Sequence, residues 1–259
     1  MDIHDMHVHT KYSCDSDAEL EAYCPEAIKR GVKTVCFTDH VDYNVFDHGY
    51  GYYKADGVLK DFAHIKEKYR GEPDFLCGVE FSEPHLYQDK LKEYSDLPYD
   101  YILGSVHYWH ENMFPTEMIK AKIPVEICYE KYWDEILSAV KNGGFDVLAH
   151  IDFPKRYYKQ LIFDPEKIRE ICNIMIQNNI CLEINTSSLR KDLAESMPDK
   201  EILSIYKACG GKYITVGSDA HKADELAADY HYAKGLIDFF GFEEIIFHQR
   251  ERIGVKNLN

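Results

Sequence analysis

The sequence predicts one α/β domain, a parallel barrel that spans residues 1–259. Seven short β-type segments alternate with longer helix-like segments, which is the order expected of parallel strands joined by right-handed crossovers. No glycine-rich phosphate loop follows the first strand segment, so a barrel is favoured over an open doubly wound sheet. The length is typical of a single barrel, and no repeat, low-complexity tract or linker divides the chain.

Each of the seven predicted strands ends in polar or charged residues. The strands occupy residues 2–9, 33–40, 74–81, 100–107, 145–152, 180–187 and 212–221. The first predicted helix, at 16–31, has acidic residues early and a Lys-Arg-Gly sequence late, as helix caps and the helix dipole favour. The same pattern predicts helices at 125–144, 164–179 and 198–211.

The composition disfavours several classes of function. A formal net charge of −15 argues against binding of long nucleic acids or anionic membranes, because lysine and arginine hold phosphate backbones. No stretch approaches the ~20 apolar residues of a membrane helix, and the start MDIHDMH lacks the regions of a secretory signal. The eight cysteines are scattered singly, so we expect reduced thiols in a cytoplasmic protein.

Metal-capable side chains gather at the C-terminal ends of the predicted strands. In a parallel barrel these ends meet at one face, so residues far apart in the chain converge there. Because side chains alternate along a strand, two histidines separated by one residue face the same side and can chelate one ion. Imidazoles and carboxylates are ligands of Zn²⁺, Mn²⁺ and Fe²⁺, and a set of this size predicts two or three ions. The set comprises His7, His9, His40, Glu80, His107, His150, Asp219 and His221.

Short motifs carry a family resemblance. The segments HVHTKYSCDS, FTDH, GVE, GSVH, AHID and GSDAH, in that order, resemble the motifs of the polymerase-and-histidinol-phosphatase (PHP) superfamily. The resemblance spans essentially the whole chain. Within the superfamily, EPHLY, YILGSVHYW and LEINTSSLRK resemble the histidinol-phosphatase branch. The resemblance implies a distorted (β/α)7 barrel that holds three metal ions and has its active site at the C-terminal ends of the strands.

The resemblance also assigns ligands to the ions. The first ion would be held by His7, His9, Glu80 and Asp219, the second by Glu80, His107 and His150, and the third by Asp15, His40 and His221. Glu80 would therefore bridge the first two ions. Asp15 follows His9 at the family's usual distance, but Asp17 becomes the ligand if the loop register shifts. His4 lies too early in its strand to reach the site.

The implied chemistry is hydrolysis of a phosphate monoester. Two ions that share Glu80 could activate one bridging water and bind the phosphate oxygens, so no serine, cysteine or aspartyl nucleophile is required. Arg156 and Arg190 are candidates for a bidentate phosphate clamp, with a surface salt bridge as the alternative for each. Asp42 has three candidate roles: to protonate the leaving alkoxide, to hold a substrate ammonium, or to orient a histidine ligand. His85, on a loop after the third strand, is a candidate substrate contact.

A metal-dependent histidinol-phosphate phosphatase of histidine biosynthesis is the leading hypothesis. Its substrate carries an amine and an imidazole, and the segments VDYNVFDHGYGYY and HYWHENMF supply carboxylates and aromatic walls. A second hypothesis is another small phosphate ester, such as a nucleotide or an oligonucleotide end.

Two further hypotheses fit less well. A C–N bond hydrolase of amidohydrolase type usually carries a metal-bridging lysine, which these strand ends lack. A metal-stabilised binding module is disfavoured because structural zinc sites are closed and often rich in thiolates. We expect a monomer or a small homo-oligomer.

Overall fold

The computed structural model describes residues 2–71 and 73–258. Its strands are β1 (Ile3–Val8), β2 (Val32–Val41), β3 (Asp74–Ser82), β4 (Tyr101–Ser105), β5 (Val147–Leu148), β6 (Cys181–Asn185), β7 (Tyr213–Gly217), β8 (Glu243–His248) and β9 (Glu251–Gly254). Its α-helices are α1 (Tyr23–Arg30), α2 (Ala55–Lys68), α3 (Gln88–Ser95), α4 (Pro115–Lys120), α5 (Val125–Asn142), α6 (Lys155–Tyr158), α7 (Pro165–Gln177), α8 (Lys200–Ala208) and α9 (Tyr230–Phe240). Short 3₁₀ helices are η1 (Leu20–Ala22), η2 (Ser187–Arg190), η3 (Ala223–Glu225) and η4 (Val255–Asn257).

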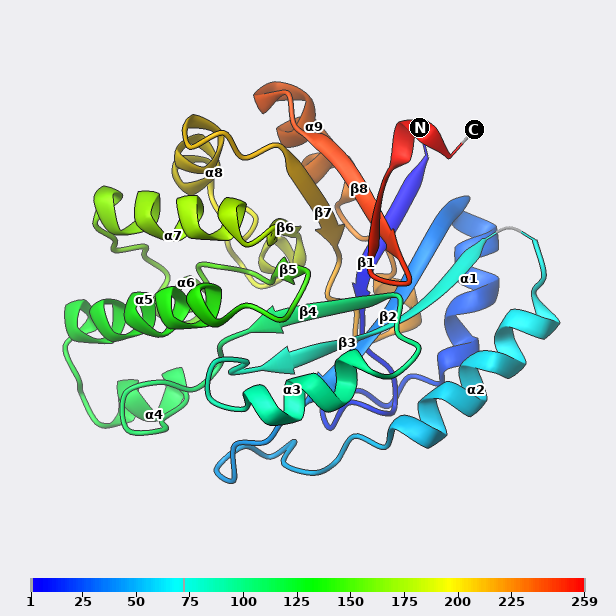
Figure 1. Cartoon of the computed structure of the whole chain (residues 1–259), viewed down its shortest axis with the longest axis horizontal. Coiled ribbons are helices and arrows are strands. Elements are labelled where there is room, and N and C mark those ends of the chain that lie inside the picture. The colour runs from blue at the N-terminus through cyan, green and yellow to red at the C-terminus, as the bar shows by residue number, and fades with distance from the viewer. Residues whose placement is uncertain (1, 72, 259) are drawn as a thin grey trace.

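The sheet follows the chain order from β1 to β9. Strands β1 to β8 pair in parallel, and β9 folds back antiparallel on β8 (Figure 1). The seven predicted strands correspond to β1–β7, and the four predicted helices to η1 with α1, α5, α7 and α8. The β8–β9 hairpin and helices α2, α3, α4, α6 and α9 were not among the predicted elements.

The predicted distorted barrel is confirmed, but its sheet does not close by a continuous ladder. The edge of β7 at Tyr213 and Ile214 pairs with β8, and no ladder joins β7 to β1 among the described residues. Beyond β7 a single parallel bridge joins Val8 to Ala220. Next to this bridge, the backbone N–H of Asp219 donates to the carbonyl of His7 at 2.8 Å. We call this incomplete junction between β1 and residues 219–220 the seam.

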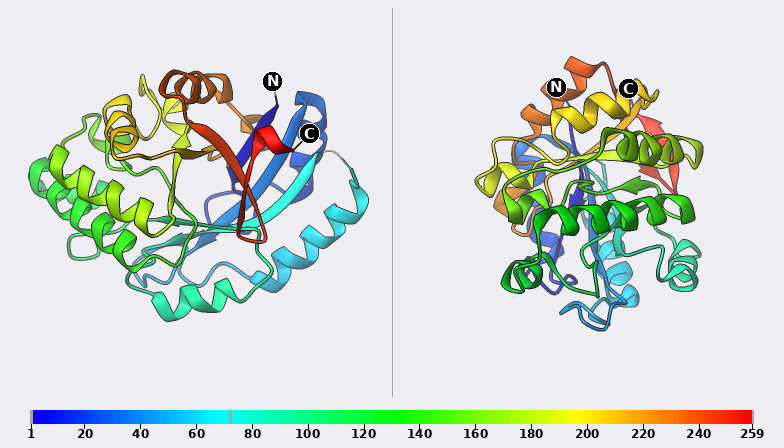
Figure 2. Two further views of the ribbon diagram at one scale, coloured as in Figure 1. Left: turned by 45° about the horizontal axis from the view of Figure 1, so that its top comes forward. Right: turned by 90° about the vertical axis from the view of Figure 1, so that its left-hand side faces the viewer.

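Helices cover the outside of the curved sheet. Helices α1 and α2 lie on one side of the molecule, and α5 and α7 lie on the other (Figure 2). Helix α5 buries Tyr132, Trp133, Ile136 and Val140, whose spacing puts them on one helical face. Burial of each such large apolar side chain contributes about 1.5–3 kcal/mol relative to exposure. This packing fixes the wall behind strands β4 to β6.

Side-chain caps set the beginnings of two predicted helices. Asp164 accepts a hydrogen bond from the backbone of Glu166, and Pro165 occupies the first turn of α7. Asp199 caps α8 in the same way, with bonds from the backbone N–H groups of Glu201 and Ile202. Both helices are therefore somewhat shorter than the predicted segments.

Candidate metal centre

Polar side chains from different strands converge at the C-terminal ends of the sheet, and Glu80 of β3 lies at their centre. Its Oε1 lies 2.9 Å from Nε2 of His150 and 3.4 Å from Nε2 of His107. Its Oε2 faces the other way, 3.1 Å from Nε2 of His7 and 3.4 Å from Nε2 of His9. One carboxylate therefore contacts two groups of imidazoles, with one oxygen for each group.

The first group brings together His7 and His9 of the N-terminal strand segment with Asp219 beyond β7. The two Nε2 atoms lie 2.9 Å apart. Asp219 Oδ1 lies 3.3 Å from Nε2 of His9. All three side chains are buried, and they meet across the seam.

The second group comprises Glu80 on β3, His107 after β4 and His150 after β5. His107 also belongs to a further group with His40 and Asp42. Glu80 of the second group also contacts His7 and His9 of the first group through its other oxygen, which is the arrangement expected of a bridging carboxylate.

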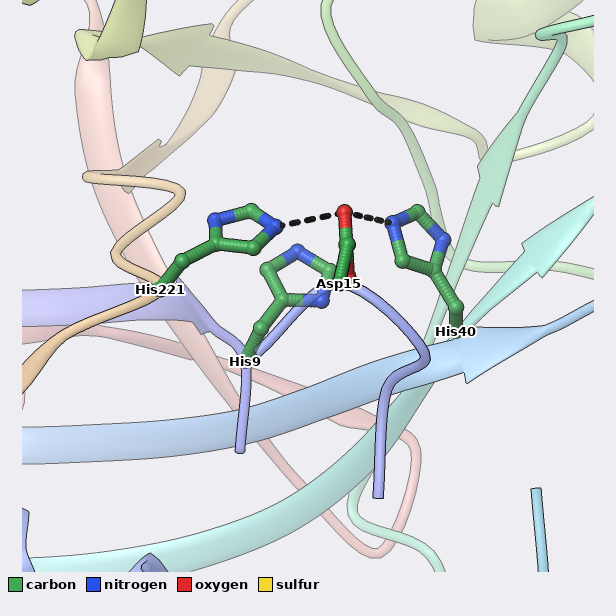
Figure 3. Close-up of side chains that lie close together, drawn as sticks. All are labelled: His9, Asp15, His40 and His221. Carbon is green, nitrogen blue, oxygen red and sulfur yellow. Dashed lines mark hydrogen bonds and ion pairs between the residues drawn. The ribbon is translucent and has the colours of Figure 1, made fainter. Parts of the chain in front are cut away.

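The third group surrounds Asp15 (Figure 3). Asp15 Oδ2 lies 3.0 Å from Nε2 of His221 and 3.7 Å from Nε2 of His40, and the ring of His9 lies beside them. Asp17, the alternative ligand, is exposed and belongs to none of these groups among the described residues. The structure thus brings Asp15 to the site in the register that the resemblance implies.

Hydrogen bonds fix the tautomers of four imidazoles so that Nε2 faces the centre. Nδ1–H of His7 donates to the carboxylate of Glu183 at 2.6 Å, and that of His221 donates to the carbonyl of Asp219 at 3.0 Å. His9 and His107 each donate Nδ1–H to a serine hydroxyl that in turn donates to an aspartate. Nδ1 of His9 lies 3.0 Å from Ser13, and the Ser13 hydroxyl donates to Asp39. Nδ1 of His107 lies 3.1 Å from Ser82, and the Ser82 hydroxyl donates to Asp42. Imidazoles held in this way present Nε2 to a metal ion.

The buried carboxylates of the site are stabilised in their charged form by neighbouring imidazoles. Burial opposes the charged form of Glu80, yet His40 and His7 hold its pKa well below its usual range. Burial, with the neighbouring imidazoles of His221 and His40, lowers the pKa of His9 to about 3, so His9 stays neutral. Burial also opposes protonation of His7, but Glu183 and Glu80 raise its pKa well above its ordinary value. The buried carboxylates thus retain their charge, and the donor set fits divalent metal ions.

Arg156, at α6, binds the metal-ligand candidate Asp219. Its guanidinium donates to Asp219 Oδ2 at 2.7 Å and to the hydroxyl of Ser187 at 2.7 Å. Its buried Nε has no hydrogen-bond partner among the described residues. Arg156 also lines a cavity of about 530 Å³ that opens over the metal centre. The side chain therefore orients one ligand and remains able to contact a bound anion.

Asp42 lies in the wall of the same cavity. Its Oδ1 accepts the proton of Ser82 at 2.6 Å, and Ser82 accepts from His107. Burial raises the pKa of Asp42. Of its predicted roles, orientation of a histidine ligand is the one that these contacts support directly.

The remaining two predicted substrate contacts point elsewhere and do not line the cavity. Nε2 of His85 lies 2.7 Å from Glu135 on α5. Arg190 donates to the carbonyl of Ser218 at 2.6 Å and therefore supports the backbone next to Asp219. These placements favour structural roles for both side chains.

Sequence reasoning did not identify several residues of the site. Glu183 of β6 holds His7, and Glu83 accepts from the backbone N–H groups of His107 and Tyr108. Burial raises the pKa of Glu83 to about 7. Lys191 lines the cavity, and burial with the neighbouring Arg156 and Arg190 lowers its pKa. The signal for Glu183 was present in the sequence, because Glu183 stands between Leu182 and Ile184. Side chains alternate along a strand, so Glu183 faces the side opposite to these two apolar residues, which is the inward face.

The fold and the donor set together define a class of protein: a distorted α/β barrel with a multinuclear metal centre at the C-terminal ends of its strands. Residues 5–187 match the PHP domain family, and the chain belongs to this family.

Relatives of similar length cover nearly all of the chain. It is 28% identical over 253 residues to a probable histidinol-phosphatase of Thermotoga maritima, with 97% of this chain and 98% of the relative covered. It is 26% identical to a histidinol-phosphatase of Lactococcus lactis, with 93% and 92% covered. The crystal structure of histidinol phosphate phosphatase from Lactococcus lactis, complexed with zinc, L-histidinol and phosphate, superimposes with a TM-score of 0.81 at 22% identity and covers 97% of this chain and 98% of that one. This last likeness confirms the fold.

Proposed function

We propose that this chain is a metal-dependent phosphomonoesterase that hydrolyses L-histidinol phosphate to L-histidinol and phosphate. The observation that carries the proposal is Glu80, whose two oxygens contact separate imidazole groups beneath an open cavity. Relatives named histidinol-phosphatase, which match over nearly the full length, support the choice of substrate.

We propose that the metal ligands are the nine predicted residues. They are His7, His9, Asp15, His40, Glu80, His107, His150, Asp219 and His221. Zn²⁺, Mn²⁺ and Fe²⁺ all accept such nitrogen and oxygen donors. When bound here, two or three such ions would lower the pKa of a coordinated water and offset the negative charge of a phosphate ester.

The chain's own cationic groups would then orient the phosphate. Arg156 is the first candidate, because it lines the cavity and its guanidinium lies beside Asp219. Lys191 lines the same cavity, and no hydrogen bond of its ammonium is found among the described residues. The guanidinium of Arg156 and the ammonium of Lys191 together offer one planar and one point-charge contact for phosphate oxygens.

The outer part of the cavity suits the cationic remainder of the substrate. Asp47 and Glu117 line it, together with the aromatic rings of Phe46, Tyr108 and Phe114. Carboxylates can pair with the ammonium of histidinol phosphate, and aromatic faces can stack on its imidazole. Asp42, between this region and the metal centre, stands where it could pass a proton towards the leaving alkoxide.

The cytoplasmic location and the oligomeric state of the chain stay predictions from the sequence. Within residues 2–71 and 73–258, no helix is both long and apolar enough to cross a membrane. The eight cysteines are free, which agrees with a cytoplasmic location. We propose a single catalytic domain that acts as a monomer or a small homo-oligomer.

Phosphate release from a panel of monoesters tests the function. The protein is stripped with a chelator and assayed with Zn²⁺ or Mn²⁺ restored, on histidinol phosphate, nucleoside monophosphates and a short 5′-phosphorylated oligonucleotide. We expect turnover to be highest on histidinol phosphate, to vanish without metal and to vanish in His9→Ala. His64→Ala, which alters an exposed histidine on α2, is the matched control and should retain full activity. Activity confined to nucleotides would contradict the proposed substrate and favour the alternative phosphoesterase.

A further inference from the structure

Behind the metal ligands lies a second layer of polar side chains on β6. Glu183 and Asn185 are both buried and face inward, while Leu182 and Ile184 face the helices. Glu183 Oε1 accepts Nδ1–H of His7 at 2.6 Å. Its other oxygen, Oε2, accepts the backbone N–H of His150 at 2.9 Å. One carboxylate therefore contacts two candidate ligands that are assigned to different ions.

His150 depends strongly on this contact for its position. Its φ of 21° is a conformation that L residues rarely adopt, and its Nδ1 has no hydrogen-bond partner among the described residues. Besides the contact of its Nε2 with Glu80, the hydrogen bond of its backbone N–H to Glu183 is what fixes the residue. On the other side, His7 relies on Glu183 for its tautomer, because only the Nδ1–H form leaves Nε2 free for a metal ion.

The same layer extends to the third member of the first group. Asn185 Nδ2 lies 3.3 Å from Glu183 Oε2 and 3.5 Å from Asp219 Oδ2. The carboxylate is buried against the backbone of Gly217 on β7, where an added Cβ would lie only 2.2 Å from Glu183 Oε1. Glu183 is therefore held in one place by both neighbouring strands.

We propose that Glu183 is a positioning residue that couples the first and second metal positions. The proposal rests on the metal centre described under the proposed function. Groups that hold metal ligands by hydrogen bonds typically change metal affinity by about 10–100-fold when they are replaced. Since Glu183 holds His7 and His150, its loss should weaken binding at the first two positions together. The third position, at Asp15, His40 and His221, receives no hydrogen bond from Glu183 and should be unaffected.

Zn²⁺ titration of chelator-stripped protein tests this coupling. In Glu183→Gln, an amide NH₂ replaces one of the two accepting oxygens, so one of the two N–H groups loses its acceptor. The other N–H group keeps only a neutral amide oxygen in place of the charged carboxylate, which weakens its hydrogen bond as well. We expect two of three Zn²⁺ affinities to fall about 10–100-fold while the third stays within twofold of wild type. Competition with a chromophoric chelator gives the affinities, and elemental analysis after gel filtration gives the number of ions retained.

Glu244→Gln is the matched control. Glu244 on β8 is also a buried glutamate, accepts the hydroxyl of Tyr230 at 2.5 Å and contacts no metal-ligand candidate among the described residues. Its substitution should leave all three affinities unchanged. Glu183→Asp keeps the charge but is too short to reach both His7 and His150, so it should also weaken both positions and provides the test if Glu183→Gln does not fold.

Three results would overturn the coupling: unchanged affinities, loss at one position only, or equal losses at all three. The proposed function is judged separately. If wild-type protein binds three ions and Glu183→Gln weakens two of them, the coupling stands even where histidinol phosphate is not hydrolysed. If wild-type protein binds no Zn²⁺, the metal centre itself is refuted.

Discussion

Gly217, the last residue of β7, should not tolerate a single added methyl group. A Cβ built on Gly217 would lie 2.2 Å from Oε1 of Glu183 and 2.4 Å from Cβ of His7. Both separations are far below van der Waals contact, and both neighbours are buried. The backbone of Gly217 does not have a positive φ, so alanine is excluded by the neighbouring side chains alone.

The size of the effect follows from two opposing terms. Overpacking a filled interior lowers the free energy of unfolding by about 1–3 kcal/mol. Replacement of glycine by alanine restricts the unfolded chain and returns about 0.4–1 kcal/mol. We therefore expect Gly217→Ala to lose roughly 1–2 kcal/mol in metal-free protein. It should also weaken Zn²⁺ at the first position by about 10-fold or more, because His7 or Glu183 must move.

Urea unfolding of chelator-stripped protein measures the first effect, and Zn²⁺ titration measures the second. Gly235→Ala is the control. This glycine lies within α9 and its φ is not positive. Apart from its chain neighbours and its own helix backbone, no atom of the described residues lies within 4 Å of the place that an added methyl group would take. There alanine should add about 0.5–1 kcal/mol, as in any helix interior. If Gly217→Ala matched Gly235→Ala in both stability and Zn²⁺ affinity, the close packing of Glu183 against His7 would be refuted.

Three further outcomes are expected. Zn²⁺ at 100-fold above its dissociation constant should stabilise the wild type by about 2.7 kcal/mol per ion, measured as a rise in thermal midpoint that a chelator reverses; no rise would contradict the metal centre. Arg156→Ala should cost about 3–5 kcal/mol in metal-free protein because Asp219 loses its buried partner, and less with Zn²⁺ bound; an equal loss in both states would contradict charge compensation by the ion. Burial lowers the pKa of His4 to about 4, below its usual 6.5, so His4 favours the folded state above pH 6.5 and loses that contribution as the pH falls towards 4. Urea unfolding from pH 7 to 4 should show a slope flatter by up to about 1.4 kcal/mol per pH unit in His4→Gln, and an unchanged slope would remove His4 from the acid response.

The parallel barrel could be predicted because its strands carry their own signals. In β1 the residue alternation places His7 and His9 on one face, and each later strand ends in a recognisable polar residue. The β8–β9 hairpin has no such local signal. Strand β8 begins with two glutamates and pairs with β7 only at Glu243 and Glu244, so its place depends on an edge formed elsewhere in the chain.

The parts of the site that could not be predicted from the sequence likewise depend on contacts with distant residues. Eight of the nine candidate ligands could be identified because they lie at or just beyond strand ends, and Asp15 was assigned from the family resemblance. The direction of a loop side chain, by contrast, depends on distant partners. His85 pairs with Glu135, fifty positions later, and Arg190 bonds the carbonyl of Ser218. Neither partner can be read from the local sequence. The inward position of Glu183 could have been read from strand parity, but its bond to His7 joins residues 176 positions apart.

The open seam and the placement of the ligands have one structural cause. Asp219 adopts a φ of 54°, which costs an L residue about 1 kcal/mol and ends the regular course of β7. This turn lets the Asp219 backbone bond the carbonyl of His7 while its side chain approaches His9. A regular ladder to β1 would require an extended backbone at this point and would not allow the turn. Ions held by His9 on one side and by Asp219 and His221 on the other would therefore join the two edges that the backbone leaves largely unpaired.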